Sequence, residues 1–213
     1  GSKMNLTVIN DGTKDSSARA TNGIETFDVT FVDADATNTG PEGFTLNLAS
    51  LSGAKNFIVN ANSTAAAGAG GSDTLTFNGL TKAQTLTIKS ADSDLSVKAT
   101  YKSGELSNTA DEVTVKLDAA KVGTLTIDDS ATEAAETVIL NATGANTVKA
   151  LDIDSNKLKT LKVTGAGDLT VTDKIASTEF DSSATKNTID ASGASGKVTL
   201  RTDLTSKLEA KGG

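Results

Sequence analysis

Aspartates in the expected turns are the side chains of this chain best suited to hold a metal ion. Ca²⁺ takes about six to eight oxygen ligands from carboxylates, carbonyls and water. Asp152 and Asp154 alternate with Ile153, so in a strand both carboxylates would project to one face. We predict Ca²⁺ as a cofactor, and a solvated polar face or turn capping remains the alternative for each residue. The candidates are Asp128, Asp129, Asp152, Asp154, Asp168 and Asp190.

Side chains suited to catalysis are few. The chain has no His and no Cys, which removes the commonest general base and the usual triads. The carboxylate pairs Asp128–Asp129 and Glu133–Glu136 are of the kind that glycosidases use. No Trp and a single Tyr leave almost no aromatic platform for a sugar ring. We predict that the protein is not an enzyme, and a polysaccharide-cleaving β-helix enzyme is the least favoured alternative.

The charge distribution bears on the partners of the chain. Asp and Glu number 27 against 20 Lys and Arg, for a net charge of −7, which repels a phosphate backbone and predicts no nucleic-acid partner. No apolar run approaches the roughly 18 residues of a membrane span, so we predict no membrane insertion. Five lysines could contact neighbouring subunits or an acidic cell-surface polysaccharide, or be solubilising charges on a wet strand face. They are Lys149, Lys157, Lys159, Lys162 and Lys174.

The elements that would position these residues are short strands. Aliphatic and β-branched residues alternate with a period of two, as in 27–31, 85–88, 124–127 and 197–200. This alternation predicts strands with one buried and one solvated face. Strand centres recur about every 9 to 12 residues in the second half, with Gly, Asn and Asp between them. That spacing is typical of either a β-sandwich or a β-solenoid.

Two features favour an all-β fold of the parallel β-helix or β-solenoid type, built from short rungs. The turns at 142–145, 165–168 and 191–196 have related sequences, and the interior positions are uniformly Leu, Val or Ile. Tandem Ig-like β-sandwiches, divided near 103–111, are the alternative. We expect one elongated solenoid domain over residues 5–213, with a flexible loop at 61–72. Residues 1–4 resemble a disordered remnant of a cleaved tag.

Three segments resemble the crystalline surface-layer (S-layer) proteins and related RTX-like cell-surface proteins that Gram-negative bacteria export by type I secretion. The segments are 23–29, 161–171 and 189–199, within a resemblance that covers roughly residues 23–200. In that family such phrases recur in β-solenoid rungs, and assembly depends on calcium. The resemblance also implies a calcium nonapeptide, G-G-x-G-x-D-x-U-x. Residues 68–76 match it except at Ala69, which makes Asp73 a further candidate ligand.

That nonapeptide stands alone, whereas a calcium roll takes ligands from successive turns. A glycine-rich turn before a strand is therefore the alternative for this segment. For function we expect a non-enzymatic structural component of an extracellular bacterial surface layer. It would self-assemble with copies of itself through a rigid β-rod, with the help of calcium. An adhesin or ligand-binding module of a secreted surface protein is the second candidate.

Overall fold

The computed structural model of the chain describes residues 1–10, 21–33, 43–61, 73–89, 95–129, 134–153, 156–204 and 207–212. The structure is 64% strand with almost no helix, so the predicted all-β class is confirmed. The predicted loop at 61–72 lies outside the described residues except for Ala61, which ends a strand. Two 3-10 turns are present among the described residues, η1 (Leu48–Ser50) and η2 (Ser177–Glu179).

Most strands belong to two large sheets. The nine-stranded sheet contains β1 (Ser2–Asn10), β3 (Ile24–Asp33), β6 (Asn56–Ala61), β8 (Thr85–Ile88), β10 (Glu112–Asp118), β12 (Thr137–Thr143), β14 (Thr160–Gly165), β16 (Asn187–Ala194) and β18 (Leu208–Lys211). The seven-stranded sheet contains β4 (Gly43–Asn47), β7 (Thr74–Leu80), β9 (Ser96–Tyr101), β11 (Lys121–Asp129), β13 (Ala145–Ile153), β15 (Asp168–Val171) and β17 (Val198–Thr199). Strands β2 (Thr21–Asn22) and β5 (Leu51–Ser52) form a small third sheet.

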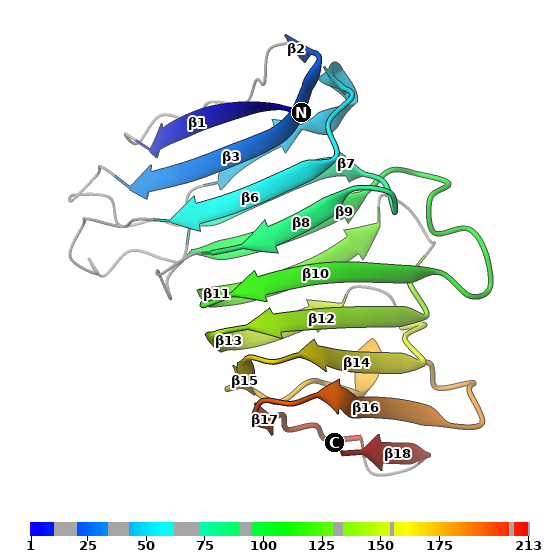
Figure 1. The fold of residues 1–213 in the computed structure, drawn as a ribbon. Helices are drawn as coiled ribbons and strands as arrows, with labels where there is room; N and C mark the ends of the chain where they lie inside the picture. Colours follow the sequence, from blue (N-terminus) through cyan, green and yellow to red (C-terminus); the bar gives the residue numbers. More distant parts are fainter. Residues whose placement is uncertain are drawn as a thin grey trace.

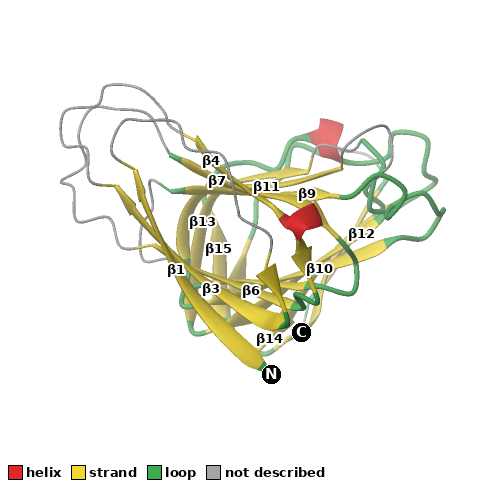
Figure 2. Cartoon of the chain, turned by 90° about the horizontal axis from the view of Figure 1, so that it is seen from above, coloured by secondary structure: helices red, strands yellow, loops and turns green. Residues whose placement is uncertain are grey.

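From β3 onward the chain passes back and forth between the two large sheets, so each coil contributes one strand to each of them (Figure 1). Neighbouring strands in both sheets are parallel, as in β12 with β14 and β11 with β13. Viewed along the stack, the two sheets face each other across a common interior (Figure 2). The result is a β-solenoid of about 6 turns, as predicted. The alternative of tandem Ig-like sandwiches is wrong, because those are built from antiparallel sheets.

The length of the coil varies along the chain. Asn141 and Thr164, on adjacent strands, are separated by 23 residues, whereas Gln84 and Ala54, on adjacent coils, are separated by 30. Loops of different length join the strands, so equivalent positions do not recur at a constant spacing. This variation explains why the sequence alone shows short strands but no fixed repeat.

The core consists of ladders, meaning columns of inward side chains on consecutive coils. Phe27 and Phe57 stack with their ring centroids 5.8 Å apart, and Phe77 from the opposite sheet lies 5.6 Å from Phe57. The predicted aliphatic ladders are thus present, but phenylalanines fill them near the N-terminal end. One ladder of the nine-stranded sheet runs through Phe27, Phe57, Leu86, Val115, Leu140 and Val163.

The corners between the sheets are built from glycine. Gly144, Gly167 and Gly196 lie on three consecutive coils, where each connection leaves the nine-stranded sheet. A Cβ on Gly167 would collide with the backbone of Thr143 and Gly144, and one on Gly196 would collide with the backbone of Gly167. The related turns noted in the sequence are therefore one corner used repeatedly, and close backbone stacking requires glycine there.

The N-terminal residues are part of the first strand. Residues 2–4, expected to be a disordered remnant, lie in β1 and pair with β3, with Met4 opposite Phe27. Nine strands at a spacing of about 4.8 Å make a stack about 40 Å tall. A strand of nine residues, such as β1, spans about 30 Å. The solenoid formed by this chain is therefore only slightly taller than it is wide.

Candidate functional site

Asp128 has a cationic partner in the structure. It lies on β11, and its carboxylate is 2.8 Å from Nζ of Lys98 on the neighbouring strand β9. The Asp128 side chain is only 15% exposed, so the ion pair is partly shielded from water. Asp129 ends β11, but its side chain lies outside the description, as does all of Asp154.

Three other predicted calcium ligands, Asp168, Asp190 and Asp152, accept hydrogen bonds within the chain. Oδ1 of Asp168 accepts from the backbone N–H of Lys197 at 2.7 Å. Oδ1 of Asp190 accepts from the backbone N–H and the hydroxyl of Ser192 at 2.9 and 2.6 Å, and these bonds hold the pKa of that carboxyl below its ordinary value. Asp152 accepts a long hydrogen bond of 3.4 Å from Thr126. Asp73 is half-buried directly before β7.

These aspartates do not converge on one point. Asp128 and Asp152 lie on strands of the seven-stranded sheet, Asp168 begins a later strand of that sheet, and Asp190 lies on the other sheet. Within the described ranges, no three acidic side chains come close enough to hold one metal ion. The calcium prediction therefore depends on single carboxylates that would share an ion with other ligands.

Ion pairs between adjacent coils are the main electrostatic feature of the surface, and sequence reasoning did not identify them. Each joins a lysine to a carboxylate one coil away, at 2.5 to 2.8 Å: Lys3–Asp28, Lys55–Glu25, Lys82–Asp111, Lys89–Asp118 and Lys98–Asp128. The hydrogen bond from Lys89 is the main reason that the pKa of Asp118 lies below its ordinary value. Four of these pairs are 29 or 30 residues apart and Lys3–Asp28 is 25 apart, which is close to the length of the coil at each place.

Asp111 is the most enclosed of these carboxylates, with 3% of its side chain exposed. It accepts hydrogen bonds from Nζ of Lys82 at 2.5 Å and from the backbone and side-chain N–H groups of Asn108 at 2.7 and 3.1 Å. Burial alone raises the pKa of Asp111, but the Lys82 and Asn108 bonds outweigh it and leave the pKa below its ordinary value. Its backbone N–H donates to Oε2 of Glu136 on the next coil at 2.8 Å. This cluster fastens three consecutive coils together.

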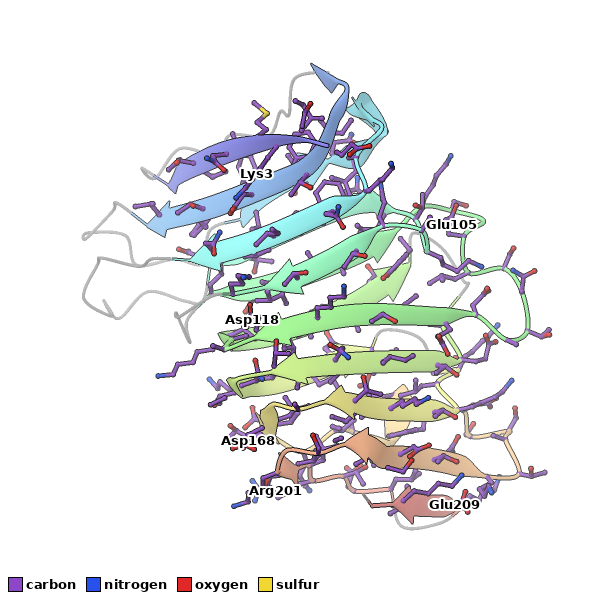
Figure 3. All side chains as sticks on the ribbon, in the orientation of Figure 1. Lys3, Glu105, Asp118, Asp168, Arg201 and Glu209 are labelled. Atoms are coloured by element: carbon purple, nitrogen blue, oxygen red, sulfur yellow. The ribbon has the colours of Figure 1, made fainter. Side chains whose placement is uncertain are left out.

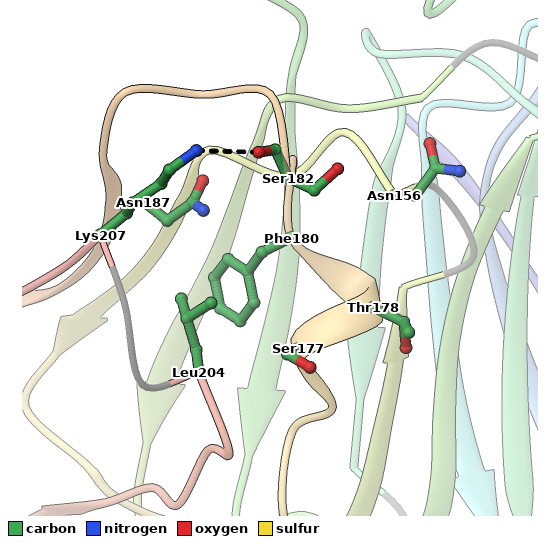
Figure 4. A pocket seen from close by; sticks show the side chains of 8 residues that line it. All are labelled: Asn156, Ser177, Thr178, Phe180, Ser182, Asn187, Leu204 and Lys207. Atoms are coloured by element: carbon green, nitrogen blue, oxygen red, sulfur yellow. Dashed lines mark hydrogen bonds between the residues drawn. The ribbon is translucent and has the colours of Figure 1, made fainter.

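A pocket of about 480 Å³ lies near the C-terminal end (Figure 4). Its apolar wall is formed by Phe180 and Leu204, and Nζ of Lys207 at its edge donates to the backbone carbonyl of Ser182 at 2.9 Å. Sequence reasoning named none of these residues, because the chain segments that form the pocket are distant in sequence and carry no motif. The lining residues are Asn156, Ser177, Thr178, Phe180, Ser182, Asn187, Leu204 and Lys207.

The five lysines singled out in the sequence do not share one surface. Lys149 is exposed on β13 of the seven-stranded sheet, whereas Lys162 is half-buried on β14 of the nine-stranded sheet. Lys157 and Lys174 are exposed in connections, and Lys159 immediately precedes β14. Figure 3 shows charged side chains distributed along the height of the stack, from Lys3 to Glu209. A polysaccharide partner for these lysines remains a proposal.

The carboxylate pairs considered for glycoside hydrolysis are only partly described. Glu136 is buried and engaged with the backbone of Asp111, and Glu133 lies outside the described residues, as does the side chain of Asp129. No protein-family model, curated protein or solved structure matches the chain. Among the described residues, no helix is long and apolar enough to span a membrane.

Proposed function

We propose that this chain is a non-enzymatic structural segment of an extracellular bacterial surface layer and assembles with copies of itself. The observation that carries the proposal is that, among the residues that the structure describes, the apolar side chains of the core are less completely buried at the two ends of the stack. The partly buried apolar residues gather there, with Met4, Leu6, Ile24 and Phe44 at one end and Ile189, Val198, Leu200 and Leu204 at the other. These ends coincide with the terminal strands of both sheets, β1 and β4 at one end and β18 and β17 at the other.

An open sheet end presents unpaired backbone groups to which another strand can add. A solenoid is stable through contacts between neighbouring coils, and its end coils need a cover. A further coil, from another copy or another part of a surface protein, would cover the apolar side chains at these ends. The resemblance of 23–29, 161–171 and 189–199 to S-layer and type I-secreted proteins supports the extracellular setting.

Leu208 allows the end contact to be tested. It lies on β18 and is 37% exposed. We expect the chain to be monomeric at low concentration and to associate weakly at high concentration, as measured by sedimentation velocity. Leu208→Lys should weaken this association, because it places a charge in the end contact. Thr109→Lys is the matched control, because Thr109 is exposed in the connection between β9 and β10, away from both ends of the stack. Equal association of the two variants would contradict an end contact through β18.

Calcium is proposed to assist assembly by bridging carboxylates of different copies. The net charge of −7 makes copies repel one another at neutral pH, and a divalent cation would offset this repulsion. We expect light scattering and the melting temperature to rise with calcium relative to chelator. Magnesium at the same ionic strength is the control. Identical melting and scattering curves with calcium and chelator would exclude this part of the proposal.

The second candidate is a ligand-binding module of a secreted surface protein. The pocket near the C-terminal end favours it, because a mechanical segment needs no such cavity. The two functions are compatible, since a scaffold can carry a binding site at one position. Ligand-binding measurements on the monomeric chain test the binding function without a contribution from self-association.

A further inference from the structure

The chain segments that form the two ends of the stack carry opposite charge. Residues 1–47, which contain the end strands β1 and β4, have three basic and seven acidic side chains, a net charge of −4. Residues 195–213, which contain the end strands β17 and β18, have four basic and two acidic side chains, a net charge of +2. Charge complementarity therefore disfavours a contact between two identical ends and favours a contact between two unlike ends.

The direction of the strands also favours a contact between unlike ends. The end strands β1, β4, β17 and β18 are all parallel to their neighbours. If the β18 end of one copy stacks on the β1 end of the next, the new strand pairs are parallel as well, and both sheets continue (Figure 1). A symmetric contact between two like ends has a two-fold axis perpendicular to the stack, which makes the new pairs antiparallel. Stacking of unlike ends thus repeats the contact that already joins the coils.

The inward side chains of β1 and β18 can cover each other in such a stack. Leu6 on β1 is half-buried and lies opposite the buried Val29, so its side chain faces the interior. Leu208 on β18 lies opposite the buried Asn187 and is 37% exposed. Both leucines alternate with polar residues along their strands. A parallel register that keeps this alternation in phase places the two inward faces in one column and removes both leucines from water.

We infer that copies of this chain stack head to tail, with the β18 end of one copy on the β1 end of the next, so that the assembly is polar and open-ended. This inference rests on the proposed self-assembly and specifies its partner, which is the opposite end of a second copy. A contact between unlike surfaces leaves one free end of each kind on every oligomer, so growth continues beyond the dimer. A contact between two like ends would stop at the dimer.

Two variants of the full chain, each blocked at one end, test this polarity. Leu6→Lys places an ammonium in the contact surface of β1, and Leu208→Lys places one in that of β18, where burial of an unpaired charge is costly. In sedimentation velocity we expect the parent chain to form a concentration-dependent series of oligomers, and each variant alone to stay monomeric. An equimolar mixture of the two variants should form a heterodimer that does not grow, because the mixture supplies one intact end of each kind. Amide NMR spectra that match the parent chain outside the substituted strand show that each variant retains the fold.

A matched pair of charge variants tests the contribution of the end charges. Lys211→Glu makes the β18 end less basic, and the Lys211 side chain is 49% exposed. Lys149→Glu changes the total charge of the chain by the same amount, at an exposed position on β13 inside the seven-stranded sheet. We expect Lys211→Glu to weaken association by about threefold or more relative to Lys149→Glu.

Three results would overturn the inference and leave self-assembly in place. The first is that Leu6→Lys or Leu208→Lys alone forms a dimer, which would show a contact between two like, intact ends. The second is that the mixture stays monomeric although the parent chain associates. The third is that Lys211→Glu and Lys149→Glu weaken association equally. A parent chain that stays monomeric at high concentration would instead overturn the proposed self-assembly, and the head-to-tail contact with it.

Discussion

At the residue scale, Gly167 and Gly196 lie where the backbones of successive coils stack closely. A methyl group on Gly167 would overlap the backbone of Thr143 and Gly144, which cannot move without displacing the coil below. We expect Gly167→Ala to lower the free energy of unfolding by about 1–3 kcal/mol, the usual cost of overpacking. Chemical denaturation of the variant and the parent chain measures this change in the free energy of unfolding.

The control for this substitution is Gly43→Ala. A methyl group at Gly43 would meet only the backbone carbonyl oxygen of Thr74, at 3.8 Å, which is ordinary van der Waals contact. Equal losses of stability in the two variants would show that close stacking at the corner is not the cause.

Asp111 links acidity to stability at the same scale. Its pKa is lower in the folded chain than in the unfolded one, so its contribution is present above about pH 4. The contribution is lost as the pH falls through the lower, folded pKa. We expect Asp111→Asn to lower the free energy of unfolding at pH 7 by about 1–3 kcal/mol. In this variant the free energy of unfolding should also decrease less steeply as the pH is lowered.

Asp173→Asn is the matched control, since Asp173 is exposed and forms no ion pair within the described ranges. Melting curves at several pH values compare the two variants. If the difference between Asp111→Asn and the parent chain did not shrink on acidification, the Lys82 and Asn108 bonds would not be what stabilises the charged form.

At the scale of the elements, each coil is stabilised mainly by its two neighbours. Phe57 on β6 is fully buried and contacts Phe27 on β3 and Phe77 on β7. We expect Phe57→Ala to cost about 3–5 kcal/mol and Phe57→Leu clearly less, because leucine fills most of the space. In a solenoid each coil contacts only its neighbours, so this loss of stability should affect mainly the adjacent coils.

Hydrogen exchange should therefore report a local effect of Phe57→Ala. Protection is expected to fall in β3, β6, β7 and β8, while β14 and β16 keep theirs. Uniform loss of protection over all strands would instead show that the coils unfold as one cooperative unit.

At the scale of the whole molecule, the stack is too short to act as a long rod by itself. With a height of about 40 Å and a width of about 30 Å, one chain would need stacked copies or further coils to span distance. We expect small-angle scattering of the monomer to give a single compact particle with a radius of gyration of about 17 Å. Two separate maxima in the distance distribution would contradict a single solenoid.

The sequence by itself determined the class of structure and the orientation of most side chains. The alternation at 27–31 and 124–127 identifies strands and their buried residues, because the side-chain period of two is a local property of the backbone. The glycine turns at 142–145 and 165–168 likewise reveal a repeated corner. The absence of His and Cys settled which common catalytic groups are missing.

Only the tertiary structure decided which strands are neighbours. Strand pairs such as Thr137 with Thr160 and Thr26 with Asn56 have different spacings in sequence, because loop length is weakly constrained energetically. The ion pair of Lys82 with Asp111 and the pocket around Asn187 follow from that pairing. Both bring together residues more than 20 positions apart, and no local pattern in the chain encodes such contacts.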